Sequence, residues 1–124
     1  MNWNIMVIFS LIMLKASAEG DIDTVRSLID QAKGFDLDFS LLNASLFGHI
    51  DIVKLILSKG ERSHCYNTAM YNAASHGHIE IVRLMLNLGA DNIQEIIHAC
   101  EDPHLKKLLS KLFRQQSLLV KPLG

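Results

Sequence analysis

The apolar positions of this chain recur at the spacing of short amphipathic helices. Ile50, Val53 and Leu57 stand at positions i, i+3 and i+7, and residues 79–86 repeat the same spacing. This spacing gathers apolar side chains into one stripe along a helix, with polar side chains on the outward side. A helix this short is marginal on its own in water, so the pattern predicts helices that bury their stripes against neighbours.

The stripe belongs to a longer cassette that occurs three times without gaps, over residues 16–29, 44–57 and 73–86. Each copy contains one glycine, and the glycines are 28 and 29 residues apart: Gly20, Gly48 and Gly77. Small residues precede each glycine and an acidic residue follows it. Glycine ends a helix because it takes positive φ without strain, and a carboxylate favours the start of the next helix. Each copy therefore predicts a helix–turn–helix unit.

A weaker fourth copy follows the third. Ile96, Ala99 and Cys100 stand where the third copy has Met70 and its two alanines, and Pro103-His104 replaces the Gly-His pair. An end unit of a stacked array has one face in water, so its sequence is free to drift from the interior pattern.

The third copy resembles the ankyrin repeat most closely. Thr68-Ala69-Met70-Tyr71 stands in place of the family's Thr-Pro-Leu-His, Ala73-Ala74 and Gly77-His78 match outright, and Gly89-Ala90-Asp91 closes the unit. Several matches at each of several periods form a specific signal. The resemblance covers roughly residues 10–113.

The fold class that this resemblance implies is all-α: an ankyrin-type helical repeat solenoid, built as a right-handed stack of about four helix–turn–helix units. We expect the units at about residues 10–34, 39–62, 68–91 and 94–113. Residues 114–124 form a C-terminal tail, either a frayed extension or a cap whose residues 118–120 dock on the fourth unit. The units are four or five residues shorter than the family's usual length of about 33, so we expect short or absent β-turn fingers and compact, mostly helical connections.

The N-terminal segment has two interpretations. Residues 5–14 are apolar apart from Ser10, and Ala16-Ser17-Ala18 is typical of a signal-peptidase site, which would make the chain a secreted or membrane-associated protein. No Lys or Arg precedes the apolar run, however, and the run is too short to span a bilayer. In the repeat register the same residues form a first inner helix, buried against the second unit.

The net charge and the cysteine content indicate which partners and which cellular compartment suit this chain. The chain has 12 basic and 13 acidic residues and a net charge of −1, which gives no electrostatic footprint for nucleic acid. Two cysteines, Cys65 and Cys100, are too few for a disulfide scaffold and are expected to be reduced thiols. We expect an intracellular, cytoplasmic monomer with no membrane contact, unless the N-terminal run is a targeting segment.

No motif in the sequence predicts catalysis, a cofactor or a metal site. His49 and His78 belong to the repeat framework, and so, less securely, does His104. There is no Cys-x-x-Cys, His-Glu-x-x-His, Gly-x-Ser-x-Gly or phosphate-binding loop. The predicted function is that of a protein–protein interaction module, although the sequence is also compatible with a remnant of a longer array.

The predicted contacts with a protein partner lie at the positions that differ between units. In the ankyrin family the two residues before Gly-His lie on the concave recognition side; here the candidates are Leu46 and Phe47 in the second unit and Ser75 and His76 in the third. Two large apolar side chains can anchor an interface, or a compact array can tuck them between units. His64 and Tyr66 are further candidates, because they match the family's finger tip.

Overall fold

The computed structural model describes residues 3–119, and all regular structure in that range is helical. The elements, in chain order, are α1 (Trp3–Glu19), α2 (Ile22–Leu28), η1 (Ile29–Gln31), α3 (Gly34–Phe47), α4 (Ile50–Leu57), η2 (Ser63–Cys65), α5 (Tyr66–Ser75), α6 (Ile79–Leu88), α7 (Ile93–Ala99) and α8 (Pro103–Leu119). The two η elements are single turns of 3-10 helix.

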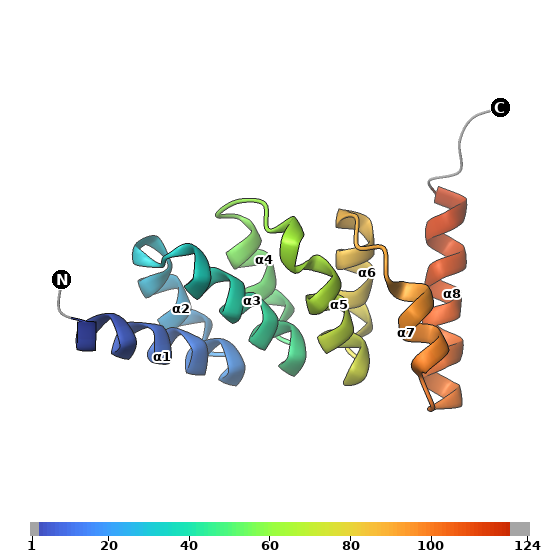
Figure 1. Cartoon of the computed structure of the whole chain (residues 1–124), viewed down its shortest axis with the longest axis horizontal. Coiled ribbons are helices and arrows are strands. Elements are labelled where there is room, and N and C mark those ends of the chain that lie inside the picture. The colour runs from blue at the N-terminus through green and yellow to red at the C-terminus, as the bar shows by residue number, and fades with distance from the viewer. Residues whose placement is uncertain (1–2, 120–124) are drawn as a thin grey trace.

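The helices form four pairs that stack side by side, as Figure 1 shows. The inner helices α1, α3, α5 and α7 pack in sequence, each on the next. The outer helices pack in the same order, α2 on α4 and α4 on α6, and α8 packs on α6. This arrangement confirms the predicted all-α repeat solenoid.

The core runs as a continuous layer between the two rows of helices. In the second unit its most buried outer-helix residues are Ile52, Val53 and Ile56, and the third unit buries Ile81, Val82 and Met85 in the same way. Ile50 and Leu57, which the sequence placed in the buried stripe, are only partly buried. An outer helix packs both on its inner partner and on the outer helices beside it, so its buried arc is wider than one stripe.

The connections between units are short, as expected from the repeat length. The described residues contain no β-strand, and the turns η1 and η2 occupy the places where longer ankyrin repeats build fingers. Gly89 caps α6 with a φ of +114°. Gly60 does not cap α4, because the C-cap there is Ser58 in a right-handed conformation.

Helix α1 keeps the predicted register but not the predicted burial. It begins at Trp3, earlier than the expected unit boundary at residue 10, and it buries Met13, Ala16 and Ser17. The expectation that the whole apolar run is buried against the second unit is wrong for Ile5 and Ile8, among others, which are exposed. Helix α1 ends the stack, so only one of its flanks meets a neighbouring inner helix (Figure 1).

The last helix is longer than expected. Helix α8 continues through residues 114–119, so the predicted boundary between the fourth unit and a tail falls inside a helix. Leu109 and Leu112 are buried, whereas Leu118 is exposed and does not dock on the fourth unit. The predicted docking segment ends at residue 120, which lies outside the described residues, as does the side chain of residue 119.

Candidate protein-interaction surface

The Gly-His pairs join each unit to the one before it. His49 Nε2 donates a hydrogen bond to the main-chain oxygen of Ala18 at 2.9 Å, and His78 Nε2 donates to that of Leu46 at 3.1 Å. Each imidazole also covers the glycine of the preceding unit: a Cβ atom on Gly48 would lie 2.5 Å from the ring of His78. These histidines therefore tie inner-helix ends together through their Nε2 atoms.

Asparagines form a second set of bonds between inner helices. Asn43 Nδ2 donates to the main-chain oxygen of Leu14 at 3.4 Å, and Asn72 Nδ2 donates to that of Leu42 at 3.3 Å. Both asparagines occupy the same repeat position, so the bonds hold the three inner helices in one register. A rigid row of helices presents its exposed side chains at fixed spacing.

The fourth unit is joined less closely. His104 is exposed, and among the described residues no bond links it to the third unit. A Cβ atom on Gly77 would meet no atom within 4 Å, in contrast to Gly48. A hollow of about 320 Å³ opens instead between α5 and the last pair, with Tyr71, Ala74 and Leu105 in its wall.

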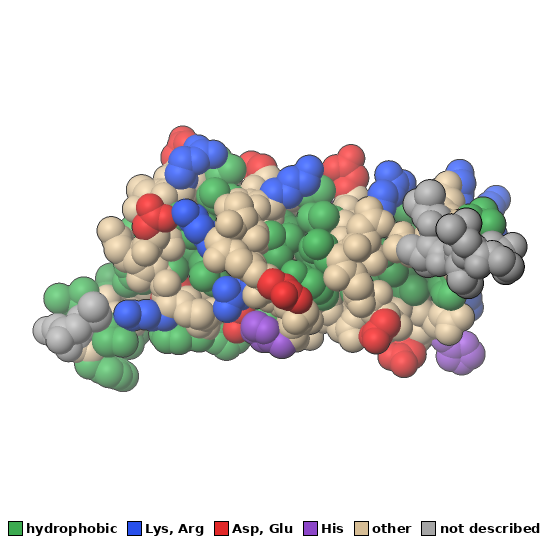
Figure 2. Space-filling model, turned by 90° about the horizontal axis from the view of Figure 1, so that it is seen from above, with side chains coloured by type: hydrophobic (Ala, Val, Ile, Leu, Met, Phe, Trp, Pro, Cys, Tyr) green, Lys and Arg blue, Asp and Glu red, His purple; other side chains and the backbone are tan. Residues whose placement is uncertain are grey.

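A group of exposed apolar side chains lies on the inner helices, on the side away from the outer row. We call it the inner-helix apolar face. On α3 it follows the spacing i, i+4, i+7, i+11, which lines up one side of a helix. The large side chains of the face that are exposed, or half-buried in the case of Leu42 and Leu46, are Val7, Leu11, Phe35, Phe39, Leu42, Leu46 and Tyr71. Figure 2 shows hydrophobic side chains along the lower edge of the N-terminal half, where this row of helices lies.

A small hollow adjoins this face. It encloses about 110 Å³ between α1 and the start of α3, and its wall includes Ile5, Phe9 and Phe35. Lys33 and the Ser10–Asp36 pair, in which the hydroxyl donates to the carboxylate at 2.6 Å, form its polar rim. A single apolar side chain of a partner would fit such a space.

The predicted site residues at the end of α3 are on the surface. Phe47 is 50% exposed and Leu46 is half-buried. Phe47 is therefore not tucked between units, which was the alternative to a partner contact, whereas Leu46 is partly covered. Leu46 continues the inner-helix apolar face, whereas Phe47 stands one residue further round the helix, at its end.

The corresponding residues of the third unit are polar and exposed. The Ser75 hydroxyl donates to the main-chain oxygen of Asn72 at 2.9 Å and lies 3.1 Å from His76 Nδ1. The His76 ring stacks on that of His78, with centroids 6.2 Å apart. This end of the surface can offer hydrogen bonds, in contrast to the apolar second unit.

The predicted finger-tip residues separate into one surface residue and one core residue. His64 is exposed and its Nε2 lies 2.9 Å from Asp38 Oδ2. Tyr66 is only 6% exposed and its hydroxyl accepts a hydrogen bond from the Arg62 main chain at 3.3 Å. Tyr66 was predicted as a partner contact; its burial instead makes it part of the core, because the turn η2 replaces a projecting finger with a helix start.

Asp38 is the centre of a polar cluster that fastens η2 to α3. Besides His64, it pairs with the Arg62 guanidinium. Burial alone would raise the pKa of Asp38, but the hydrogen bonds from His64 and Arg62 and their charges lower it below its ordinary value. Burial, with the Asp38 charge adding to it, raises the pKa of the Cys65 thiol to about 11.

This cluster also contains the three side chains that most resemble a metal site. One ligand atom from each of Asp38, His64 and Cys65 lies within 4.8 Å of the others. A metal ion would have to compete with the Arg62 guanidinium for the carboxylate and displace a proton from a thiol whose pKa is raised. The observed contacts describe a clamp between α3 and η2.

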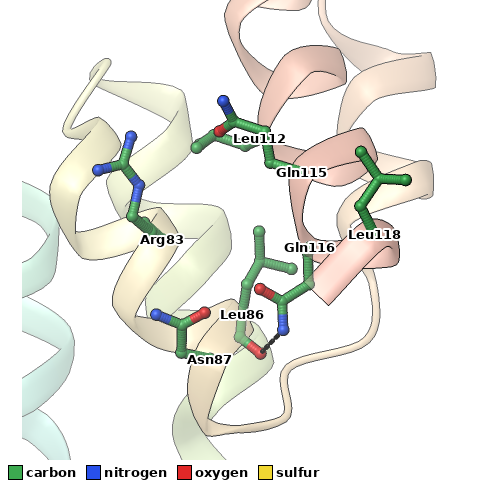
Figure 3. A pocket seen from close by; sticks show the side chains of 7 residues that line it. All are labelled: Arg83, Leu86, Asn87, Leu112, Gln115, Gln116 and Leu118. Carbon is green, nitrogen blue, oxygen red and sulfur yellow. Dashed lines mark hydrogen bonds between the residues drawn. The ribbon is translucent and has the colours of Figure 1, made fainter. Parts of the chain in front are cut away.

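A second, more polar groove lies on the outer row, between α6 and α8 (Figure 3). It has a volume of about 540 Å³, and Arg83, Asn87 and Gln115 face it together with Leu86. Gln116 Nε2 closes one end by donating to the main-chain oxygen of Leu86 at 3.4 Å. The groove lacks aromatic side chains, so it offers fewer anchors than the inner-helix apolar face.

Sequence reasoning missed most of the inner-helix apolar face. It selected Leu46 but not Phe35 or Phe39, which lie three and two turns earlier, respectively, on the same side of α3. The helical spacing was visible in the sequence, because Phe35, Phe39, Leu42 and Leu46 follow it without exception. What the sequence did not show is that this side of the helix meets solvent.

The fold and its inter-unit bonds define the chain as a tandem helical repeat protein. The family model for ankyrin repeats (3 copies) matches residues 12–96, and the chain belongs to the ankyrin repeat family. No curated protein and no solved structure gives a significant match. Ankyrin repeats are generally protein-interaction modules, bind protein partners and are typically non-catalytic. Within residues 3–119, none of the helices has the length and apolar character needed to cross a membrane.

Proposed function

We propose that this chain is a non-catalytic module that holds a protein partner against the inner-helix apolar face, on the concave side of the stack. The main support is that large apolar side chains of three inner helices are exposed on this face. Val7 and Leu11 on α1 occupy the repeat positions of Phe35 and Phe39 on α3, and Tyr71 on α5 is exposed with them. A monomeric protein rarely leaves so continuous a group of apolar side chains without a contact to make. Three of the five are aromatic, and aromatic residues are the commonest anchors of interfaces.

The hydrogen bonds between the inner helices favour binding at the inner-helix apolar face. The bonds from His49, His78, Asn43 and Asn72 fix the inner helices before a partner arrives. Little backbone entropy is then lost on association, so the buried apolar area contributes more to affinity. The partner that suits this surface presents an apolar segment, with one side chain able to enter the hollow beside Phe35.

The remaining predicted contacts surround this face. Leu46 extends it, Phe47 forms its edge at the end of α3, and Ser75 and His76 offer polar contacts beside it. His64 contributes at the start of α5 as far as its bond to Asp38 allows. Tyr66 is left out because it is buried.

Phe35→Ser with Phe39→Ser tests the proposal. Affinity capture and mass spectrometry should identify partners that the wild type retains and this variant loses, with binding weakened at least about tenfold. Leu88→Ser is the matched control, since Leu88 is an exposed apolar residue on the outer helix α6. Leu46→Glu with Phe47→Glu should weaken capture of the same partners.

The melting temperature of each variant separates a surface effect from a loss of fold. Undiminished capture by the Phe35/Phe39 variant, with its helical content intact, would rule out the inner-helix apolar face as the binding surface. A collapse in stability of the Leu46/Phe47 variant would show that this pair is part of the core.

We place the module inside the cell, in the cytoplasm. Cys65 and Cys100 are both free, and a reducing compartment keeps such thiols unpaired. The alternative, a cleavable N-terminal signal, would remove α1 and with it the buried contacts of Met13 and Ala16. N-terminal sequencing of the mature chain decides, since a start at Glu19 would contradict the intracellular assignment.

A further inference from the structure

The flank of α1 that faces away from α3 carries apolar side chains at positions that interior units bury. In the second unit the two positions are Asp36 and Ser40, with exposed fractions of 5% and 1%. In the third unit they are Cys65 and Ala69, at 5% and 0%. The preceding inner helix covers them, as the bond from Ser10 on α1 to Asp36 on α3 demonstrates.

The same two positions in the first unit are Ile8 and Ile12, which are 54% and 46% exposed. Ile5, one turn earlier, is also exposed and lies at the border between this flank and the hollow beside Phe35. We call these three residues the end face; they are distinct from Val7 and Leu11, which lie on the inner-helix apolar face. A terminal repeat whose outer flank is exposed to solvent usually carries polar residues on that flank. This one has isoleucines where even the buried interior positions have Asp, Ser, Cys and Ala.

The spacing of the end face suits a helix as its partner. Ile5, Ile8 and Ile12 stand at i, i+3 and i+7, the spacing at which two helices interdigitate apolar side chains. Residues 3–14 contain no Asp, Glu, Lys or Arg. Two copies of this segment can therefore approach each other without repulsion between like charges or the cost of burying a charge.

The opposite end of the stack is unsuitable as a partner for the end face. Helix α8 exposes four cationic side chains: Lys106, Lys107, Lys111 and Arg114. A head-to-tail contact with this helix would bring the isoleucines against ammonium and guanidinium groups that prefer water. A contact between two identical end faces avoids this problem and closes on itself.

We infer that a second copy of this chain covers the end face, through an antiparallel α1–α1 contact with its two-fold axis at Ile8. In that pairing Ile8 meets its own counterpart, and Ile5 of each copy lies beside Ile12 of the other, offset by one residue along the helix. Lys15 and Glu19, paired on the surface at 3.9 Å, stay outside the apolar contact. The exposed side chains of the inner-helix apolar face remain open in both copies, although Ile5 also lines the hollow beside Phe35. The inferred dimer differs from the monomer that we expected from the sequence.

Sedimentation equilibrium of the full chain over micromolar concentrations tests the inference. The wild type should sediment as a dimer. Ile8→Glu places two carboxylates at the axis and should raise the dissociation constant by about 100-fold or more. Leu88→Glu, an apolar-to-acidic change at an exposed position of α6, should remain dimeric. Circular dichroism confirms that each variant keeps its helices.

A cysteine at the axis gives an independent measurement. Ile8→Cys in a Cys100→Ser background should form a disulfide between copies on mild oxidation, and Leu88→Cys in the same background should not. A wild type that is monomeric at every concentration, or an Ile8→Glu variant that still dimerises, overturns the inference. So does a monomer that binds vesicles of phosphatidylcholine and phosphatidylglycerol through Ile8, because a lipid surface would then cover the end face. Partner capture by Ile8→Glu reports separately on the proposed function.

Discussion

Replacing Gly48 with alanine tests how the Gly-His pairs hold the stack together. Gly48 ends α3 with a φ of +82°, and a Cβ atom there would lie 2.5 Å from His78 Cε1 and 2.5 Å from Nδ1. Gly77 follows His76, the C-cap of α5, and has a similar φ of +74°, but a Cβ atom there would meet nothing within 4 Å. The two glycines therefore share the backbone conformation and differ in the imidazole that covers one of them.

The structure gives the expected size of each effect. An alanine in the left-handed region costs about 1–2 kcal/mol, and this strain applies to both positions. At Gly48 the ring of His78 must also move, which loses its bond to Leu46 and disturbs the packing for a further cost of about 1–3 kcal/mol. We expect Gly48→Ala to lower the free energy of unfolding by about 2–5 kcal/mol and Gly77→Ala by about 1–2 kcal/mol.

Urea unfolding followed by circular dichroism measures both values, with a double-mutant cycle as the control. In a His78→Ala background the ring is absent, so the cost of Gly48→Ala should fall to that of Gly77→Ala. Equal costs for the two glycine variants in the wild-type background would refute the role of the ring. A cost for Gly48→Ala that persists unchanged without His78 would refute it as well.

Two further predictions concern the cluster around Asp38. Asp38→Asn should lower the free energy of unfolding by about 1–2 kcal/mol at pH 7, because the charge-assisted bonds to Arg62 and His64 are weakened. The folded pKa of Asp38 lies below its ordinary value of 3.8, so its contribution to stability is complete above pH 3.8 and is lost as the pH falls through the lowered pKa. Between pH 7 and pH 2 the free energy of unfolding should therefore fall more steeply in the wild type than in Asp38→Asn. Parallel curves for the two proteins would contradict this. Iodoacetamide at pH 8 should label Cys100 well before Cys65, because Cys65 is buried and its thiol pKa is raised to about 11; equal labelling rates by mass spectrometry would show that η2 opens readily.

The features that recur in the sequence were the ones it predicted well. Glycine at a helix end, a carboxylate at the next helix start and an apolar stripe are local requirements, so their repetition identified the helix pairs. Both His49 and His78 were correctly placed in the framework, although their bonds to the preceding unit could not be derived from spacing alone. The extension of α8 to residue 119 could also have been predicted, because the sequence has no proline between Pro103 and Pro122.

What the sequence could not supply depends on neighbours in space. Tyr66 is buried next to η2, and the bonds that fasten η2 to α3 join Asp38 to residues 24 and 26 positions away, which share no motif with it. The exposure of Ile8 follows from the position of α1 at one end of the row. The same side chain in an interior unit would be buried, so no local pattern distinguishes the two cases.

The interface between the third and fourth units is the weakest of the stack, so local unfolding is expected to begin at the C-terminal end. The first three units are held by histidine and asparagine bonds at both of their interfaces, and among the described residues neither bond has a counterpart at the last interface. In a stack where each unit contacts only its neighbours, stability is a sum of such interfaces. The fourth pair is then the unit that detaches first, so amide protons of α7 and α8 exchange with solvent through a local opening that leaves the inner-helix apolar face intact.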